Sequence, residues 1–378
     1  MQLNVQNYMR PDSCRTRRID VKSTRDEFGQ PPPQTIRVDS VLKLIFSRAL
    51  QGILVLLVVS ALTFALLAAA GGDALGELVS ERGAPEATLR ELRRAYGLDQ
   101  PLAARYAYWL SNLVRGRMGE SFYYHAPVAT IIWPRLVRTL ALAAVALCLA
   151  LSFSLTLGAL AARRRGSLWD RASELIILLT ASTPRIVLAL IALAIVARTS
   201  WFPVGGASAE TLADFSPLRI LPPAIVLALP LVALFLAQAR EGLAQALSQD
   251  FVQVARAKGL PERAVIMRHA LRDALNPLIT LFGYAFGSVV SGSVIVETVL
   301  GWSGLGALSV SAVRHRDVPL LMGVVMITAT AVLVGNLFAD ILLRLNDPRL
   351  RPRRTPARTR RSSSSSGGRS FNLPASGA

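Results

Sequence analysis

The sequence contains few residues of the kinds that form disulfides or bind metal ions. Its 378 residues include two cysteines and three histidines. Cys14 lies in a polar stretch and Cys148 lies inside a long apolar run, so we expect no disulfide between them. The histidines, His125, His269 and His315, are far apart in the sequence and share no ligand spacing. The sequence therefore predicts no metal site.

Lysine is also scarce, and this scarcity bears on nucleotide binding. The chain has three lysines, Lys22, Lys43 and Lys258, and none of them follows a glycine. A Walker A phosphate-binding loop requires a lysine directly after glycine. A nucleophile elbow and a paired-histidine motif are missing too. We therefore predict that the chain is not an enzyme and that any ATP hydrolysis linked to its action occurs on a separate subunit.

Charged residues are sparse and lie between long uncharged runs. Charged side chains make up 17% of the sequence and apolar side chains 52%, which predicts a membrane protein rather than a soluble domain. The formal net charge is +18, but the basic residues flank the apolar runs, as is typical of the cytoplasmic side of a membrane. From Arg344 onward there are nine arginines and one acidic residue, Asp347. We expect the partner of these charges to be the lipid bilayer and not nucleic acid.

Six apolar runs reach the length of about 20 residues that a helix needs to cross a bilayer. They cover residues 41–70, 140–162, 175–197, 220–239, 275–296 and 320–343. A cleaved signal peptide is the alternative for the first run, but its apolar stretch exceeds the ~7–15 residues of a signal core. The polar tails, residues 1–40 and 350–378, are predicted to be disordered. The membrane domain is thus expected to cover residues 41–349.

The distribution of arginine in the short loops predicts the orientation. Arg163, Arg164 and Arg165 follow the second run, and six further basic residues follow the fourth, whereas residues 199–218 contain no lysine or arginine. Because basic short loops stay in the cytoplasm, both termini are predicted to be cytoplasmic. The long loop of residues 71–135 is then external.

The basic loop after the fourth run, residues 249–277, carries the most specific pattern. Gly259 interrupts two stretches of helical periodicity, and Pro261 and Glu262 favour a helix start after it. Apolar residues then recur every three or four positions, as in a helix that lies along a surface. An ordinary amphipathic helix at the membrane interface would show the same periodicity.

The amino-acid sequence of this segment closely resembles the coupling loop, or EAA loop, of binding-protein-dependent ABC permeases of the dipeptide/oligopeptide/nickel branch. The matching positions are Asp250, Phe251, Val252, Ala255, Arg256, Ala257, Lys258, Gly259, Leu260, Glu262, Arg263, Val265, Arg268, His269, Ala270, Leu271, Arg272, Ala274, Leu275 and Pro277. Further segments resemble family motifs, among them residues 96–102, 116–121, 297–299, 304–306 and 316–319. Ser303 departs from the family pattern, which has proline there.

The resemblance implies a fold and a set of partners. The fold would be all-α and integral to the membrane, with six transmembrane helices as in type I ABC importers, in the cytoplasmic membrane of a bacterium. The partners would be a second permease subunit, two ABC ATPases and an extracytoplasmic solute-binding protein. This chain would bind no cofactor, because ATP and magnesium would bind the ATPases. Peptides, nickel chelates and small glycans are all compatible with such a permease.

The resemblance also implies which residues couple the permease to the ATPases. They are Ala255, Arg256, Lys258, Gly259, Glu262, Arg268, His269 and Leu271. Gly259 would provide the bend of the loop, and Arg256, Lys258 and Glu262 would provide polar contacts.

Two features within the runs are candidates for the translocation path. Arg185 follows Pro184 inside the third run, where a charge is costly and tends to face a polar cavity. Pairing with a neighbouring helix is the alternative. Gly283, Gly287 and Ser291 repeat every four residues in the fifth run, which indicates either close helix packing or the lining of a narrow path.

Two other classes of protein remain as alternatives. An ion-coupled secondary transporter should carry acidic or histidine relays within its spans and internal repeats. Asp340, near the end of the sixth run, is the one acidic residue of that kind. A structural membrane scaffold would need no coupling loop.

Overall fold

The computed structural model describes residues 38–69, 100–199 and 217–346. The chain divides into two compact units, residues 1–46 and 47–378. Of the first unit the structure describes only the start of one helix, at residues 38–46. In the described ranges the regular structure is helical, apart from an isolated bridge between Glu120 and Pro127.

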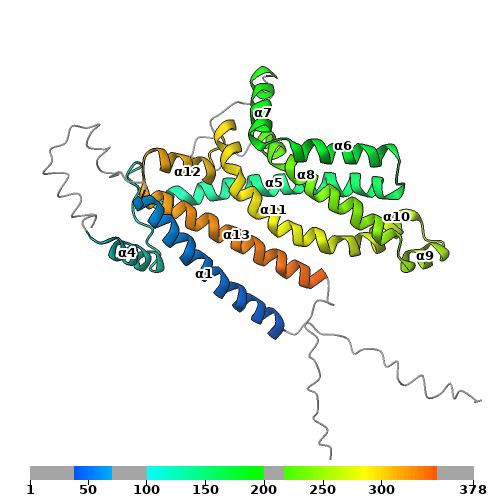
Figure 1. The fold of residues 1–378 in the computed structure, drawn as a ribbon, viewed down its shortest axis with the longest axis horizontal. Coiled ribbons are helices and arrows are strands. Elements are labelled where there is room, and N and C mark those ends of the chain that lie inside the picture. Colours follow the sequence, from blue (N-terminus) through cyan, green and yellow to red (C-terminus); the bar gives the residue numbers. More distant parts are fainter. Residues whose placement is uncertain (1–37, 70–99, 200–216, 347–378) are drawn as a thin grey trace, which may run out of the picture. The chain divides into compact units, whose positions relative to one another are not determined.

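Five helices in these ranges are long and apolar enough to cross a membrane (Figure 1). They are α1 (Val38–Ala69), α5 (Val128–Arg163), α8 (Pro217–Leu247), α11 (Leu271–Leu300) and α13 (Val318–Asn346). A sixth span results if α6 (Leu168–Ser182) and α7 (Arg185–Thr199) are counted as one bent pair. The prediction of an all-α membrane fold is confirmed.

The third predicted span, residues 175–197, is not one straight helix. α6 and α7 meet at an angle of 100°. Pro184 lies between them, and Thr183 before it has extended backbone angles, with φ −92° and ψ 119°. A residue before proline is disfavoured in the helical region because the proline ring clashes with it. The bend therefore follows from Pro184, and Arg185 begins a new helix instead of lying in the middle of one.

The core of the second unit forms where α5 and α8 pack together and α11 covers them. Phe235 and Leu236 of α8 and Leu142 of α5 are fully buried there. The two helices approach closely at Gly158, where an added Cβ would lie 3.0 Å from the Cβ of Ala239. α11, which carries the candidate residues Leu271, Gly283, Gly287 and Ser291, packs against this core.

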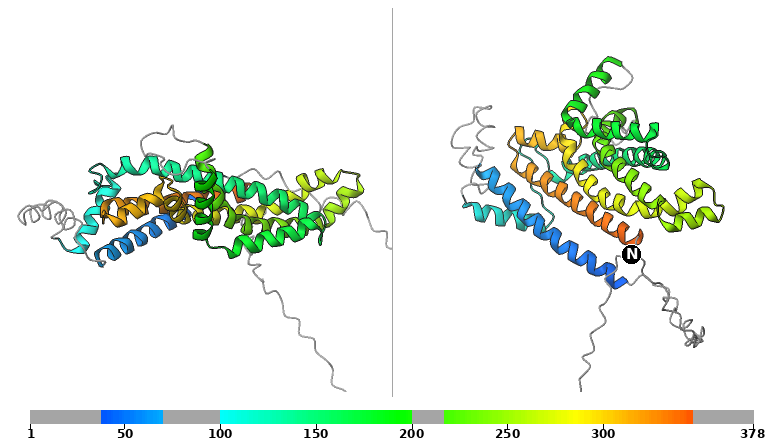
Figure 2. Two further views of the ribbon diagram at one scale, coloured as in Figure 1. Left: turned by 90° about the horizontal axis from the view of Figure 1, so that it is seen from above. Right: turned by 45° about the vertical axis from the view of Figure 1, so that its right-hand side comes forward.

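Shorter helices lie at opposite ends of the bundle (Figures 1 and 2). α9 (Asp250–Ala257) and α10 (Glu262–Ala264) lie at one end, and α12 (Leu305–Arg314) lies at the other. The stretch predicted as the external loop, residues 71–135, contains α4 (Leu102–Val114) and the first turns of α5. α5 begins before the predicted span. The prediction began later because the first turns of α5 include Pro134 and Arg135 and are not uniformly apolar.

Candidate functional site

The coupling segment consists of α9, a tight turn and α10. One face of α9 is buried, because Val252 and Ala255 pack against Val265 beyond the turn and against Leu247 at the end of α8. The two arms of the segment therefore form a small folded unit with its own apolar cluster. The predicted arrangement of helical stretches around a break at Gly259 is present.

Gly259 has a φ of +74°, the left-handed conformation that residues with a side chain rarely adopt. Its N–H donates to the carbonyl of Arg256 at 2.9 Å, and the N–H of Leu260 donates to the carbonyl of Ala255 at 3.4 Å. These bonds close the C-terminus of α9. A Cβ added at Gly259 would meet nothing within 4 Å, so the cost of substitution there is conformational and not steric.

An ion pair closes the turn. Arg256 donates two hydrogen bonds to the carboxylate of Glu262, from Nη2 to Oε1 at 2.7 Å and from Nε to Oε2 at 3.2 Å. The hydrogen bonds from Arg256 lower the pKa of the Glu262 carboxyl below its ordinary value, and the same bonds raise the pKa of Arg256. Both side chains were predicted to contact a partner, and the structure brings them together with each other.

The segment exposes three large apolar side chains among polar and basic ones. The side chains of Phe251, Val254 and Leu260 are 42%, 53% and 40% exposed, and Lys258 beside them is exposed too. Phe251 and Val254 lie three residues apart and so share one face of α9. Three exposed apolar side chains on a small projecting element form a surface suited to a protein partner.

The part of the segment after the Gly259 turn was predicted to be a separate short helix, and the structure differs. After α10 the backbone passes through a π-helical stretch, Val265–Ala270, directly into α11. Ile266 and Ala270 are buried, as their periodicity predicted, and Leu271 is half-buried. The side chains of Arg268 and His269 lie outside the described part of the structure. The coupling segment is therefore continuous with a membrane span.

Arg185 makes the helix contact that was the alternative to a role in the path. Its Nη1 donates to the carbonyl oxygen of Ser288 at 3.2 Å, and its Nη2 donates to the Ser288 hydroxyl at 2.6 Å. The guanidinium lies directly over Gly292 of α11, where an added Cβ would be 1.7 Å from Nη1. Arg185 thus fixes the start of α7 to the middle of α11.

The four-residue repeat on α11 divides into two parts. Gly283 and Gly287 face α13, since their added Cβ atoms would lie 3.0 Å from Ala339 and 3.1 Å from Val332. These two glycines allow close packing of helices, which was one of the two predicted roles. Ser291 is exposed instead.

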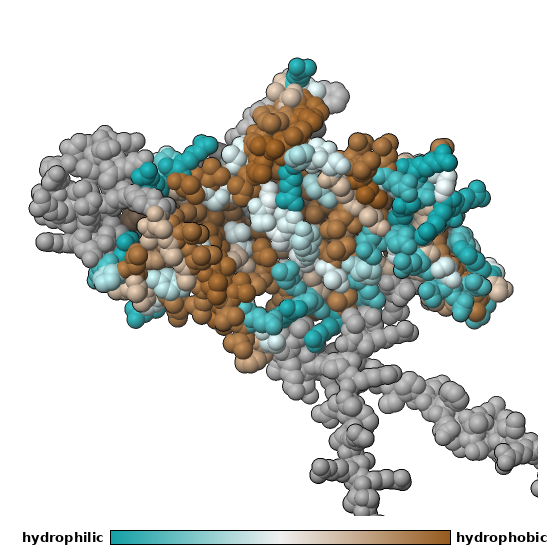
Figure 3. Space-filling model, in the orientation of Figure 1, coloured by the Kyte–Doolittle hydropathy of each residue, from teal (hydrophilic) through white to brown (hydrophobic). Residues whose placement is uncertain are grey.

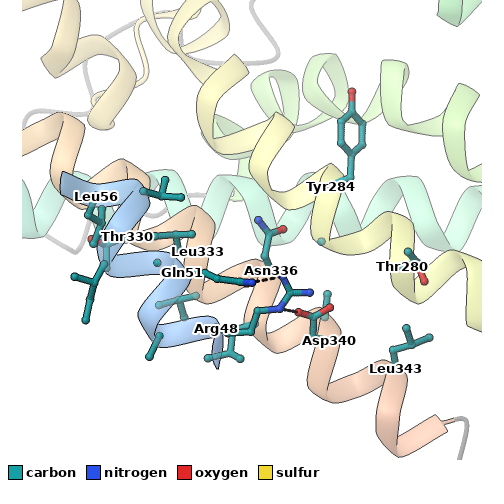
Figure 4. A pocket seen from close by; sticks show the side chains of 18 residues that line it. Arg48, Gln51, Leu56, Thr280, Tyr284, Thr330, Leu333, Asn336, Asp340 and Leu343 are labelled. Atoms are coloured by element: carbon teal, nitrogen blue, oxygen red, sulfur yellow. Dashed lines mark hydrogen bonds and ion pairs between the residues drawn. The ribbon is translucent and has the colours of Figure 1, made fainter. Parts of the chain in front are cut away.

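A cavity of about 570 Å³ lies between α1, α11 and α13 (Figure 4). Arg48 of α1 crosses it to form an ion pair with Asp340 of α13 at 2.7 Å. Thr280 and Tyr284 line it from α11, and Figure 4 shows Tyr284 pointing away from α1. Asp340, the acidic residue near the end of the sixth predicted span, therefore has a basic partner.

At the end of the bundle opposite α9, a buried carboxylate joins three helices. Glu297 of α11 accepts hydrogen bonds from the hydroxyl of Thr139 at 2.7 Å and from the N–H of Ala307 at 3.1 Å. Thr139 of α5 in turn accepts from the N–H of Leu305 at 2.8 Å. These N–H groups belong to the first turn of α12 and have no partner within that helix. Glu297 therefore anchors α12.

A second buried carboxylate, Asp317, begins α13. It accepts from the N–H of Leu320 at 3.1 Å, as an N-terminal capping residue does, and from the N–H of Tyr123 at 3.1 Å. The hydroxyl of Ser121 also donates to it. Two sequence motifs, residues 116–121 and 316–319, thus meet in space. An aspartate just before a helix start with a nearby proline was the signal for the cap.

Arginines that were predicted only as markers of orientation also form ion pairs. Arg240 of α8 contacts the carboxylates of Asp170 at 2.5 Å and Glu174 at 2.6 Å, both on α6. Arg165 contacts Glu241 at 3.1 Å. Arg240 thus joins α8 to α6, and Arg165 joins the loop before α6 to α8, at the end of the bundle that carries α9.

Comparison with known families decides the class of protein. The sequence matches the family described as binding-protein-dependent transport system inner membrane component over residues 154–352. The N-terminal component of the same kind of system matches over residues 41–143. The chain belongs to this family of permeases. The predicted resemblance is thereby confirmed.

The permease has relatives of similar length. It is 36% identical over 313 residues to the oligopeptide transport system permease protein AppB of Bacillus subtilis, with 81% of this chain and 98% of the relative covered. A protein of Brucella suis biovar 1 with a provisional peptide-permease name is 34% identical over 318 residues, covering 82% of this chain and 99% of the relative. An inward-facing structure of the MetNI methionine ABC transporter aligns with 58% of the permease and 96% of its own chain, at 16% identity and a TM-score of 0.45.

The matched ranges of the permease place the family's features on the structure. Residues 154–352 contain the coupling segment, α11 and both buried carboxylates. In the described ranges no three histidine, cysteine, aspartate or glutamate side chains are grouped to hold a metal ion. The protein is a membrane-spanning permease subunit of an ABC importer.

Proposed function

We propose that this permease imports peptides. The permease of Bacillus subtilis that shares 36% of its residues is named for oligopeptide transport, and relatives at this identity and coverage support the same class of solute. Nickel chelates and small glycans are the other solutes compatible with the coupling-loop sequence. The substrate would be delivered from outside by a solute-binding protein.

The coupling segment carries the mechanism. Two ABC ATPases, which bind ATP and magnesium, would dock on the apolar outer face formed by Phe251, Val254 and Leu260, with Lys258 at its edge. Closure of the ATPases would push this segment. Because residues 262–270 continue into α11 without a break, the movement would pass directly into a membrane span. A second permease subunit would complete the path.

This mechanism requires a cytoplasmic coupling segment and therefore cytoplasmic termini. Reporter fusions after Arg165 and after Ser248 should report the cytoplasm, and a fusion after residue 214 should report the outside. The reverse pattern of signals would reject the proposed orientation.

The turn at Gly259 provides the test of coupling. A β-branched residue is strongly disfavoured at positive φ, whereas asparagine tolerates it better than most residues. Gly259→Val should therefore abolish most ATP-driven peptide uptake while the protein remains in the membrane, and Gly259→Asn is the matched control with nearly normal uptake. Co-purification of the ATPases is measured beside uptake.

The outcomes separate the alternatives. Normal uptake and normal ATPase association in Gly259→Val would remove the coupling role from this turn. Uptake of a nickel chelate or a glycan, with no peptide uptake by the unmodified transporter, would change the assigned solute. Uptake that continues without the ATPases would indicate an ion-coupled transporter.

A further inference from the structure

The exposed face of α11 is rich in hydroxyl groups. Thr280, Tyr284, Ser291 and Thr298 are exposed, and Ser288 between them is half-buried. These positions recur every three, four or seven residues and so follow one face of the helix. Figure 3 shows a pale area over the middle of α11, between the hydrophobic surfaces of α7 and α1. The hydroxyls of Thr280 and Thr298 donate to carbonyls of their own helix, those of Asn276 at 3.2 Å and Val294 at 2.7 Å. Ile295 is also exposed on this face, so the groups that indicate a polar environment are those of Tyr284, Ser288 and Ser291.

The two edges of this face are occupied by other helices. Gly283 and Gly287 pack against α13 on one side, and Gly292 packs against Arg185 of α7 on the other. The hydroxyl face therefore runs between α13 and α7. Toward α9 it reaches the cavity between α1, α11 and α13, which Thr280 and Tyr284 line. Ser288 lies one helical turn beyond Tyr284.

Arg185 places a positive charge at this face. Its two hydrogen bonds go to a neutral residue, Ser288, and no carboxylate lies within ion-pair distance of it in the described ranges. A guanidinium has five N–H donors in a planar fork, so three of them remain available. An arginine within a span is costly unless it meets water or an anion, and a carboxylate is the anion that its geometry fits best.

We propose that Arg185, with the hydroxyls of Ser288 and Ser291, binds the carboxylate of the transported solute, and that the hydroxyl face of α11 is this subunit's wall of the path. The inference rests on the proposed peptide import, since the terminal carboxylate is the group that every unmodified peptide carries. Ser288 orients the guanidinium, and the close contact with Gly292 leaves the side chain little freedom. The hydroxyl groups offer several weak hydrogen bonds, so a solute can bind along the path and still be released from each position.

The test compares peptides that differ only in this group. The reconstituted transporter with its ATPases and binding protein is given alanine peptides of two to five residues, as free acids and as C-terminal amides. Only pairs that the binding protein holds with equal affinity are used. Arg185→Met should lower uptake of the acids by about tenfold or more, as expected for the loss of a charge-assisted hydrogen bond. Uptake of the amides should change little, and Arg185→Lys should restore part of the acid uptake.

Two further variants guard against a purely structural effect. Gly292→Ala should displace the guanidinium without removing its charge and should reproduce the selective loss. Arg198→Met, at the other end of α7, is the matched control and should leave the acid-to-amide ratio unchanged.

Each result decides between the proposals. An equal loss of acid and amide uptake in Arg185→Met would make Arg185 a structural clamp and overturn the inference. Unchanged uptake of both forms would overturn it as well. If the unmodified transporter moves no peptide in either form, the proposed function fails, and the carboxylate inference fails with it.

Discussion

α1 and α11 are both long, apolar helices, yet they expose different side chains. From residue 53 onward the exposed positions of α1 are apolar, among them Leu54 and Val58, whereas α11 exposes several hydroxyl groups together with Ile295 along one face. In the most apolar stretch of each helix, 11% of residues are buried in α1 and 33% in α11. Exposure in the isolated subunit therefore has two meanings. On α1 the exposed apolar side chains are suited to lipid, and on α11 the exposed hydroxyls are those that the proposed path would use.

The largest expected effect comes from placing a charge on each face. Val58→Arg puts a guanidinium near the centre of the lipid-facing side of α1, which costs about 3 kcal/mol. It should sharply reduce the amount of protein integrated in the membrane. Ser291→Arg, within the span of α11, should leave integration nearly normal while altering transport. Alkaline extraction of membranes measures both, and equal loss of integration would erase the distinction between the faces.

α11 also packs more closely against its neighbours than α1 does, and glycine substitutions measure this difference. At Gly306 of α12 an added Cβ would lie 2.5 Å from the Cα of Val294 of α11, a backbone atom that cannot move aside. Gly306→Ala should therefore lower the free energy of unfolding by about 1–3 kcal/mol.

Gly52→Ala is the control on α1. Its added Cβ would meet Leu333 at 3.5 Å, an ordinary contact, and replacing glycine in a helix favours folding by roughly 0.5–1 kcal/mol. Thermal unfolding in detergent should show a lower midpoint for Gly306→Ala and an equal or higher one for Gly52→Ala. Similar midpoints would mean that α12 does not pack on α11 as described.

Water access separates the two faces without adding charge. In a background with Cys14 and Cys148 replaced by serine, Ser291→Cys should react with a membrane-impermeant thiosulfonate at least about tenfold faster than Val58→Cys, because the thiolate forms only where water reaches it. Labelling rates in the assembled transporter provide the measurement. Slow reaction at Ser291 in every nucleotide state would place this residue in a dry helix contact.

Much of this architecture was predictable from the sequence, because long apolar runs and arginine-rich loops are local signals. The coupling segment was predictable for the same reason. One short stretch contains Gly259, the helical periodicity on both sides of it and the sequence that resembles the family's coupling loop. The bend at Pro184 was missed because the apolar run continues across the proline, so hydropathy alone reported one span.

The long-range contacts were not predictable from one sequence. Glu297 and Asp317 lay in the family motifs of residues 297–299 and 316–319, but their roles as helix anchors, and that of Thr139, depend on elements that are far apart in the chain. The pairing of Arg240 with α6 is of the same kind. The orientation of Gly283 and Gly287 toward α13, with Ser291 exposed, also required knowledge of which helix lies beside α11.

The smallest expected effect concerns the coupling segment, which leads into α11 and has no counterpart on α1. The side chains of Arg256 and Glu262 are 45% and 37% exposed, and an exposed ion pair contributes only about 0.2–1 kcal/mol to stability. A double-mutant cycle with Arg256→Ala and Glu262→Ala should yield a coupling energy in that range at low salt, and less at high salt. The pKa of Glu262 is lowered in the folded protein. The contribution of the pair is therefore fully present above the ordinary pKa of glutamate, about 4.3, and is lost only as the pH falls through the lower, folded value.

The charge-swapped variant separates this internal role from docking on the ATPases. Arg256→Glu combined with Glu262→Arg should restore the stability that Arg256→Glu alone loses, because the pair across the Gly259 turn is remade with reversed polarity. If Arg256 also contacts an acidic group of an ATPase, co-purification of the ATPases should stay low in the swapped variant and depend on salt. If association recovers together with stability, Arg256 acts only by holding the turn. The docking surface is then the apolar face of Phe251, Val254 and Leu260, and the polar contacts predicted for Arg256 from the sequence are contacts within the segment.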